Sequence, residues 1–332
     1  MPSLRAAVKL VLLALGLILA LPDGRHARAA DFPNRPITII VPYVPGGATD
    51  ILARIMGEQL RKSLGQNVVV VNKPGAFGIL ALEELAKGKA DGHTLMIGNN
   101  TSNVITPLLY PGKMPFKYED KVQPIAVLAD LPALLTVTTT GFEPKTLAEL
   151  MAFARNNPGK VRYGSVGVGS FPHFDTLLFA KKAGLEMVHM PSKGAGDLVN
   201  SMATGDIQMA FLNVASAASM IKAGRLKPLA AVAPQRLADY PDIPTMDEAG
   251  FAGIGTLQWL ALFGQTGTPK PATDMIFKAC MDGLQSAEVQ KAFKTADIHA
   301  APSASPAAAG EFMITETAKW KKVIADSNVK LE

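Results

Sequence analysis

Short apolar runs alternate with longer amphipathic stretches along most of the chain, and this alternation predicts β-α-β units. In the first half we expect strands at residues 37–41, 68–71 and 94–97, with helices at 49–64 and 80–86. The helix over 49–64 carries its apolar residues on one face, as a helix packed on a sheet does. A polar turn is expected after the third strand, at residues 98–103.

The second half repeats this alternation after a connection over 111–120 and two strands at 124–130 and 133–138. The helices expected there cover residues 146–156, 174–183, 198–203 and 215–222. The strands between them cover residues 161–163, 187–190, 207–212 and 229–232. One more strand at 259–263 precedes a largely helical C-terminal part.

The two series predict an α/β protein of two lobes, each a mixed, mostly parallel sheet flanked by helices. The last helices cannot form a core alone, so we expect them to pack on the first half. The predicted first lobe is therefore discontinuous, residues 31–131 plus 256–332, and the second lobe covers 132–255. Two crossings between the lobes are expected, near residues 130 and 255.

Residues 1–29 have the pattern of a cleaved signal peptide. Arg5 and Lys9 precede an uncharged apolar run over 10–21, and small residues at Ala27 and Ala29 mark the cleavage site. The run is too short to span a bilayer, which needs about 20 residues, although an uncleaved anchor remains the alternative. We therefore expect a soluble protein exported to the bacterial periplasm.

Charge and cysteine content exclude several functions. The formal charge of +5 falls to +2 without the signal, because four basic residues and one acidic residue leave with it. The remaining Lys and Arg cluster only as doublets, so no nucleic-acid partner is expected. Cys280 is the single cysteine, and the histidines lack the spacing of metal ligands. We expect a monomer without metal or cofactor.

The first candidate site is the loop over residues 42–50, which ends a strand and opens a helix. Helix N-termini at such strand ends point unpaired N–H groups toward ligands and favour anions. Gly46 and Gly47 let the backbone approach a ligand closely, and Thr49 or Asp50 is the expected N-cap. A tight turn with a cap is the alternative interpretation.

A second loop, over residues 164–173, alternates glycine and serine before a helix. It departs from a dinucleotide fingerprint because Phe171 and Pro172 stand where the third glycine is required. Exposed N–H and hydroxyl donors suit a small anion, although a flexible loop with a capping serine explains the same residues. The amides of residues 98–103 and Asn213 offer further donors, unless they only satisfy local backbone groups.

Catalytic patterns are weak, so no enzyme and no catalytic residue are expected. Gly-x-Ser-x-Gly, Walker, His-Glu-x-x-His and Cys-x-x-Cys motifs are absent from the sequence. A serine hydrolase that pairs Ser165 or Ser170 with His173 remains an alternative, but it has no third group in view. For His173, a hydrogen bond to its own loop competes with a position facing the cleft.

With these segments in hand, the chain resembles the substrate-binding receptors of tripartite tricarboxylate transporters, the Bug (TctC-like) family. The resemblance covers residues 31–332 and includes the loop over 163–173. Its other motifs, in chain order, are Phe32-Pro33-Asn34-Arg35-Pro36-Ile37, Val41-Pro42-Tyr43, Pro45-Gly46-Gly47, Asp50, Asn72-Lys73-Pro74-Gly75-Ala76, Asp91-Gly92, His189-Met190-Pro191, Lys193-Gly194, Gly205-Asp206, Pro244-Thr245, Glu248-Ala249-Gly250 and Trp259.

The resemblance implies a two-lobed periplasmic binding protein of type II that holds a small carboxylate between its lobes and delivers it to the membrane subunits of a transporter. Main-chain amides of residues 43–49 would bind the carboxylate. A sensor partner that reports the ligand to a membrane kinase is the alternative. With His173 added from the loop, the predicted ligand-binding residues are Tyr43, Gly46, Gly47, Ala48, Thr49, Asn99, Thr101, Ser102, Ser165, Gly167, Ser170, His173 and Asn213.

Four positions depart from the family pattern and bear on selectivity. Phe77 stands where the family usually repeats glycine, Ala90 where it has proline, and His93 and Ser192 where it has tyrosine. If the position of Ser192 lines the cleft, the smaller side chain would enlarge it. The ligand is then open between a di- or tricarboxylate and an aromatic or longer carboxylate.

Overall fold

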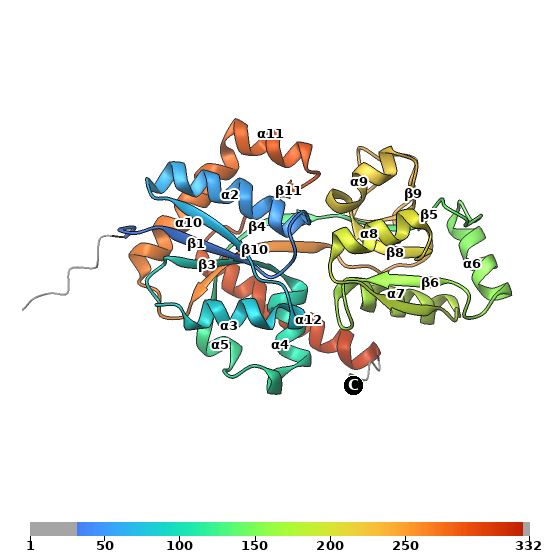
Figure 1. Cartoon of the computed structure of the whole chain (residues 1–332), viewed down its shortest axis with the longest axis horizontal. Coiled ribbons are helices and arrows are strands. Elements are labelled where there is room, and N and C mark those ends of the chain that lie inside the picture. Colours follow the sequence, from blue (N-terminus) through green and yellow to red (C-terminus); the bar gives the residue numbers. More distant parts are fainter. Residues whose placement is uncertain (1–31, 328–332) are drawn as a thin grey trace, which may run out of the picture.

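The computed structural model describes residues 32–327 and shows two α/β lobes side by side (Figure 1). The predicted signal peptide, residues 1–29, lies outside the described residues. Within 32–327, no helix combines the length and the apolar character that crossing a membrane requires. The same residues contain no group of three or more His, Cys, Asp or Glu side chains that could hold a metal ion.

The first lobe is built on a six-stranded sheet in the order β11-β4-β10-β3-β1-β2. Its strands are β1 (Ile37–Val41), β2 (Val68–Asn72), β3 (Thr94–Asn99), β4 (Val122–Leu131), β10 (Gln258–Gln265) and β11 (His299–Ala300). Its longer helices are α2 (Ala48–Leu64), α3 (Ile79–Lys87), α10 (Lys270–Gln285), α11 (Ala287–Thr295) and α12 (Pro306–Ser327). Two short helices, α4 (Thr106–Leu109) and α5 (Tyr118–Lys121), complete it.

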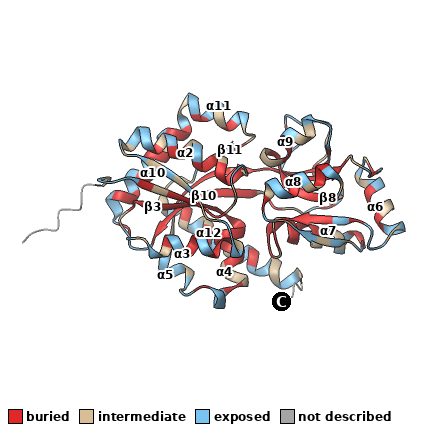
Figure 2. Cartoon of the chain, in the orientation of Figure 1, coloured by how far each residue is buried: buried red, intermediate tan, exposed pale blue. Residues whose placement is uncertain are grey.

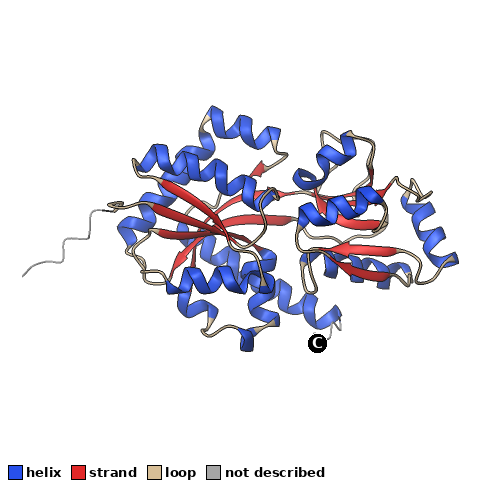
Figure 3. Cartoon of the chain, viewed as in Figure 1, coloured by secondary structure: helices blue, strands red, loops and turns tan. Residues whose placement is uncertain are grey.

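The second lobe is built on a five-stranded sheet in the order β7-β6-β8-β5-β9. Its strands are β5 (Ala133–Thr138), β6 (Arg162–Ser165), β7 (Val188–Pro191), β8 (Met209–Asn213) and β9 (Leu226–Val232). Its helices are α6 (Leu147–Asn156), α7 (Phe171–Ala183), α8 (Ala195–Thr204) and α9 (Val214–Lys222). Helices cover both faces of each sheet (Figure 3).

Both sheets are mixed, as the alternation predicts. β1 pairs in parallel with β2 and β3, and β6 with β7 and β8. In each sheet one strand lies between two neighbours to which it is antiparallel: β10 lies between β3 and β4, and β5 lies between β8 and β9. The short edge strand β11 also pairs antiparallel, with β4. The sequence pattern located β10 and β5 without indicating their direction.

Alternate side chains of β1 enter different cores on the two faces of the first sheet, as the two-residue period of a strand requires. Ile37 and Ile39 pack with α2 and α10, whereas Ile40 packs with α3 and α12. The central strands of both sheets are accordingly buried, whereas the edge strands β2, β7 and β11 and the outer faces of the helices are partly exposed (Figure 2). The C-terminal helices therefore complete the core of the first lobe.

The polar turn expected at residues 98–103 is not a turn. Gly98 and Asn99 end β3, and residues 101–105 form a π-helical turn that runs into α4. The side chain of Asn99 accepts a hydrogen bond from the N–H of Ser102 at 3.1 Å, and the N–H of Asn99 donates to Ser102 Oγ at 3.1 Å. The side chains of Asn99 and Ser102 thus form hydrogen bonds at the start of a helical segment. Composition alone did not distinguish such a segment from a loop.

The chain crosses between the sheets directly from β4 to β5, and again between β9 and β10. Beside the second crossing, Asp175 of α7 accepts hydrogen bonds from the N–H of Thr256 at 2.9 Å and from its Oγ1 at 2.7 Å. Asp175 is 2% exposed, and burial raises the pKa of its carboxyl to about 7 despite these bonds and nearby Lys319. The carboxyl is thus costly to ionise where it stands.

We expect this carboxyl to make folding pH-dependent. The pKa of Asp175 is higher in the folded protein than in the unfolded chain, where it is about 4, so the protonated carboxyl favours the folded state at low pH. This stability is fully present below about pH 4 and is lost as the pH rises through the native pKa. The free energy of unfolding should therefore fall by up to about 1.4 kcal/mol per pH unit between about pH 4 and 7. Urea unfolding of the wild type and of Asp175→Asn across this pH range measures the fall in the free energy of unfolding, and the variant should not show it. The exposed control Asp206→Asn should keep it; an unchanged pH profile in Asp175→Asn would contradict the assignment.

Candidate functional site

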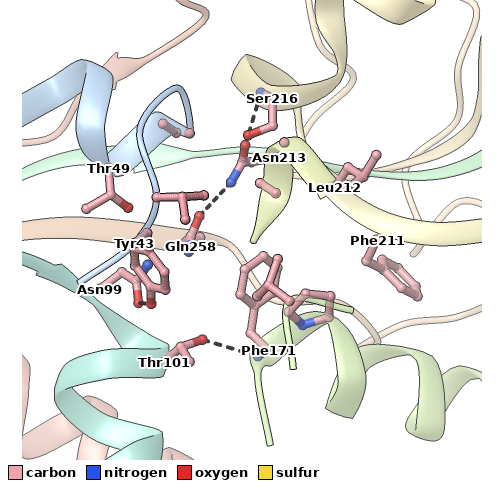
Figure 4. Close-up of a pocket in the computed structure, with 17 residues that line it drawn as sticks. Tyr43, Thr49, Asn99, Thr101, Phe171, Phe211, Leu212, Asn213, Ser216 and Gln258 are labelled. Carbon is pink, nitrogen blue, oxygen red and sulfur yellow. Dashed lines mark hydrogen bonds between the residues drawn. The ribbon is translucent and has the colours of Figure 1, made fainter. Parts of the chain in front are cut away.

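A cavity of about 50 Å³ lies between the two lobes, where strands of both sheets end and helices begin (Figure 4). Of the residues that the sequence predicts for a ligand site, it is lined by Tyr43, Gly47, Ala48, Thr49, Asn99, Thr101 and Asn213. Among the described residues that line it, none is Lys, Arg, Asp, Glu or His. Any ionic ligand would therefore meet only neutral groups.

Four helices begin at this cavity. Two are α2 and α9, whose N-caps are Gly47 and Asn213, and two are α7 and α8, whose N-caps are Ser170 and Gly194. First-turn residues of each helix line the cavity. The first N–H groups of a helix have no partner within it, and the helix dipole makes this end partly positive. The cavity therefore has a positive electrostatic environment without a cationic side chain.

The start of α2 differs from the expectation, because Gly47 is its N-cap and Thr49 and Asp50 lie in its first turn. Asp50 reaches back and accepts the N–H of Gly46 at 3.0 Å, and Arg54 Nη2 donates to it at 2.9 Å. Burial alone would raise the pKa of Asp50, but these donors and Asn72 lower it below its usual value. Gly46 has φ +93°, which favours glycine, and its N–H is already used. Gly46 does not line the cavity.

The start of α8 repeats the same arrangement in the other lobe. Residues 194–197 read Gly-Ala-Gly-Asp, where residues 47–50 read Gly-Ala-Thr-Asp. Asp197 accepts the N–H of Lys193 at 3.0 Å, as Asp50 accepts that of Gly46. The two helix starts face each other, since a Cβ at Gly47 would lie 3.9 Å from the Cβ of Ala195. Each lobe thus presents the same backbone arrangement to the cavity.

Tyr43 and Asn99 form one wall from the first lobe. The hydroxyl of Tyr43 donates to Asn99 Oδ1 at 2.8 Å, and the N–H of Ser102 donates to the same oxygen at 3.1 Å. Burial raises the pKa of the Tyr43 hydroxyl to about 12, although the bond to Asn99 opposes this rise. Tyr43 therefore stays neutral, and the Asn99 oxygen is saturated, which leaves its amide nitrogen to donate.

Two hydrogen bonds join the lobes across the cavity (Figure 4). The N–H of Phe171, in α7, donates to Thr101 Oγ1 at 3.3 Å, and Asn213 Nδ2 donates to Gln258 Oε1 at 2.8 Å. Asn213 also caps α9 by accepting the N–H of Ser216 at 3.1 Å. The Oγ of Ser216 is buried at the cavity and has no hydrogen-bond partner among the described residues. A polar ligand atom would satisfy it.

The loop over 164–173 lies outside the cavity lining except for Val166 and the start of α7. Ser165 Oγ donates to the Gly167 carbonyl at 2.9 Å and contacts His189 Nε2 at 2.7 Å. Ser170 Oγ donates to the same carbonyl at 2.7 Å, and His173 Nδ1 accepts the N–H of Gly169 at 3.1 Å. Of the predicted site residues, the ones that do not line the cavity are Gly46, Ser102, Ser165, Gly167, Ser170 and His173.

These contacts do not form the serine-histidine pair of the hydrolase alternative. Ser170 and His173 bind backbone groups of their loop and not each other. His173 stacks on His189 with ring centroids 4.2 Å apart, and burial, with His189, lowers its pKa to about 4. Ser165 contacts His189 but is fully buried, so no substrate reaches its hydroxyl in this structure. The loop supports the cavity wall from behind.

Several residues that line the cavity were not predicted from the sequence. They include Ala195 and Gly196 of α8, Gln258 at the start of β10, and Ser216. The repeated Gly-Ala-x-Asp pattern was a readable signal for the start of α8. Gln258 carried no signal, because only strand pairing brings β10 beside β3 and its first residue beside Asn213. Neither Ser192 nor Phe77 lines the cavity.

Two mixed-sheet lobes with a cavity between them are the architecture of a periplasmic binding protein, and the solved structure of the periplasmic binding protein BugD superposes on this chain with a TM-score of 0.81 at 25% identity, covering 91% of this chain and 100% of that one. Within that class, residues 52–329 match the model of the tripartite tricarboxylate transporter family receptor, and the chain belongs to this family. The chain is 30% identical to protein BugT of Bordetella pertussis over 328 residues, which cover 97% of this chain and 98% of BugT. The resemblance and the expected fold class are confirmed, and the family is one of solute-binding receptors.

Solved structures agree with this assignment. A protein of R. palustris in complex with adipate superposes with a TM-score of 0.84 at 29% identity, covering 90% of this chain and 98% of that one. MatC of Rhodopseudomonas palustris, solved with bound malate, superposes with a TM-score of 0.81 at 26% identity, covering 88% of this chain and all (100%) of that one.

We expect the two equivalent aspartates to contribute unequally to stability. Asp50→Asn keeps the shape but weakens buried charge-assisted bonds, so unfolding should cost roughly 1–3 kcal/mol less than in the wild type. Asp197→Asn changes the same contact at an exposed position and should cost less than about 1 kcal/mol. Urea unfolding at neutral pH compares them, and the effect of Asp50→Asn should shrink in acid as the carboxylate is protonated. Equal losses would contradict the role of burial.

Proposed function

We propose that the protein is a periplasmic receptor that binds a small organic carboxylate between its lobes and delivers it, as a monomer, to the membrane subunits of a tripartite tricarboxylate transporter. The observation that carries this proposal is the cavity where four helices begin and no charged side chain lies. Unpaired N–H groups at helix starts bind anions. Binding needs no bond to be made or broken.

The donors present are sufficient for a useful affinity. A hydrogen bond to a charged group contributes about 1.5–3 kcal/mol, and a micromolar dissociation constant needs about −8 kcal/mol. The first-turn amides of α2 and α8, the Asn99 amide and the Ser216 hydroxyl are the proposed donors. Several such bonds reach this value, with a margin for ordering costs. In this account the Tyr43 side chain positions Asn99 and does not bind the ligand charge itself.

The size and walls of the cavity favour short aliphatic ligands. The cavity of about 50 Å³ is compact, so a short ligand fits it with less separation of the lobes than a long one. Phe171, Phe211 and Leu212 provide apolar surface for methylene groups. The facing helix starts of α2 and α8 suit a carboxylate at each end. We therefore propose a short dicarboxylate, in keeping with the malate and adipate of the two solved relatives.

Calorimetry on the refolded protein tests the proposal. Malate and adipate should bind with micromolar dissociation constants, whereas benzoate and a neutral diamide of the same length should bind at least tenfold more weakly. No heat with any mono-, di- or tricarboxylate would overturn carboxylate binding. Delivery is tested separately: growth on the bound dicarboxylate should stop when the membrane subunits of the transporter are deleted, and unaffected growth would contradict that part.

We expect Gly47→Val to weaken binding without unfolding the protein. The φ of Gly47 is −83°, which any residue adopts, but a side chain there points at Ala195 of the other lobe. The added methyl groups would hold the two helix starts apart and weaken malate binding at least tenfold. Gly112→Val, at a glycine with open space around it, is the matched control for the substitution itself. Equal malate affinities in the two variants would place the ligand elsewhere.

Substitutions of Asn213 test whether a negative charge in the cavity prevents ligand binding while the cap of α9 is kept. Asn213→Asp and Asn213→Ser both retain an oxygen that can cap α9, so both should fold. Only aspartate adds a negative charge to the cavity, so it should abolish malate binding, while serine should weaken it about three- to tenfold. Calorimetry and thermal unfolding of both variants give the comparison. Similar affinities would show that the ligand carries no negative charge near Asn213.

A further inference from the structure

Phe77 has an unfavourable backbone conformation. Its φ and ψ are +57° and +28°, in the left-handed region that bulky residues avoid and glycine accepts. The preceding Ala76 also has a positive φ, +45°. A residue held in this region persists where its surroundings stabilise it by other contacts. The ring of Phe77 makes two contacts that a glycine at this position would lack.

The ring of Phe77 lies between the two lobes. On one side it stacks on Tyr110 of the first lobe, with ring centroids 5.3 Å apart and planes within 9°. The ring also abuts Gly167 of the second lobe, where an added Cβ would lie 2.7 Å from the Cε1 atom of Phe77. The carbonyl of Phe77 accepts a hydrogen bond from Thr106 Oγ1 at 2.8 Å, which fixes the residue to the first lobe. Phe77 is thus held to the first lobe by its backbone and its ring, and contacts Gly167 of the second lobe from there.

Gly167 stands next to a wall of the cavity. It follows Val166 and precedes Phe171, both of which line the cavity. Its φ of +124° excludes other residues, and the close ring excludes a Cβ for a second reason. The Gly167 carbonyl accepts hydrogen bonds from the hydroxyls of Ser165 and Ser170, which tie the turn together. Pressure on Gly167 therefore reaches the residues that enclose the ligand.

From this geometry we infer that Phe77 is a positioning residue that holds the turn over 166–171 against the first lobe and so sets the length of ligand that the closed cavity accepts. The contact with Gly167 exists only while the lobes are together, so it stabilises the closed form relative to an open one. A smaller residue shifts the population toward the open form and leaves more room between the lobes. The statement on ligand length rests on the proposed function, whereas the statement on closure does not.

The experiment uses Phe77→Gly, with Ala76→Gly as the matched control that relieves the same kind of strain without removing a ring. Spin labels on the exposed positions of Lys87→Cys and Lys160→Cys report the distance between lobes, and the buried Cys280 takes no label. In the unliganded protein, Phe77→Gly should shift the distance distribution to longer values, and Ala76→Gly should match the wild type. Phe77→Leu should restore part of the short distances.

Calorimetry with malate and adipate supplies the second measurement. Phe77→Gly should raise the malate dissociation constant about tenfold and that of the longer adipate by less than threefold, with thermal unfolding close to that of the wild type. Unchanged distances, or an unchanged ratio of the two constants, would overturn the inference. Failure of the wild type to bind either probe would instead count against the proposed function, since the distance measurement needs no ligand.

Discussion

Helix N-termini that meet without a cationic side chain are the physical arrangement on which the cavity depends. Backbone N–H groups at the start of a buried helix need a partner, and the converging dipoles favour one with negative charge. The protein keeps lysine and arginine out of this place, so no salt bridge competes with a ligand. Asp50 and Asp197 are set back from the cavity, where each accepts the N–H before its helix and stiffens the loop. The same small motif is thus used once in each lobe.

Closure of the lobes relies on contacts of a different kind. Hydrogen bonds from Phe171 to Thr101 and from Asn213 to Gln258 cross beside the cavity. Apolar packing reinforces them, because Phe171 and Phe174 of the second lobe join a core of the first, where Phe174 meets Trp320 with ring centroids 5.7 Å apart. The ring of Phe77 extends this contact to the loop behind the cavity wall. The residues that hold the lobes together thus lie beside the helix starts that line the cavity, so the contacts between the lobes and the shape of the cavity depend on each other.

Most of the loop over residues 164–173 does not line the cavity, although it is rich in hydrogen-bond donors. The polar groups of this loop form hydrogen bonds chiefly with one another. The hydroxyls of Ser165 and Ser170 both donate to the carbonyl of Gly167, and His173 accepts the N–H of Gly169. Satisfying buried polar groups within a tight turn uses the donors that a ligand would need. What the loop provides instead is the start of α7 and a firm support for Val166. A loop that binds a ligand and a loop that supports a cavity wall can therefore have the same amino-acid composition.

Local pattern was enough to predict most of the strands and helices, the two α/β lobes and the family, because apolar periodicity and glycine spacing are properties of neighbouring residues. It also singled out the loop before α2, whose residues Gly47, Ala48 and Thr49 line the cavity. The repeated Gly-Ala-x-Asp was equally readable at the start of α8. Three features depended on tertiary structure: the antiparallel insertion of β10 and β5, the pairing of Asn213 with Gln258, and the contact of Phe77 with Gly167. Each joins residues at least 45 positions apart, and such partners are chosen by sheet order and lobe contact, which no short stretch of sequence encodes.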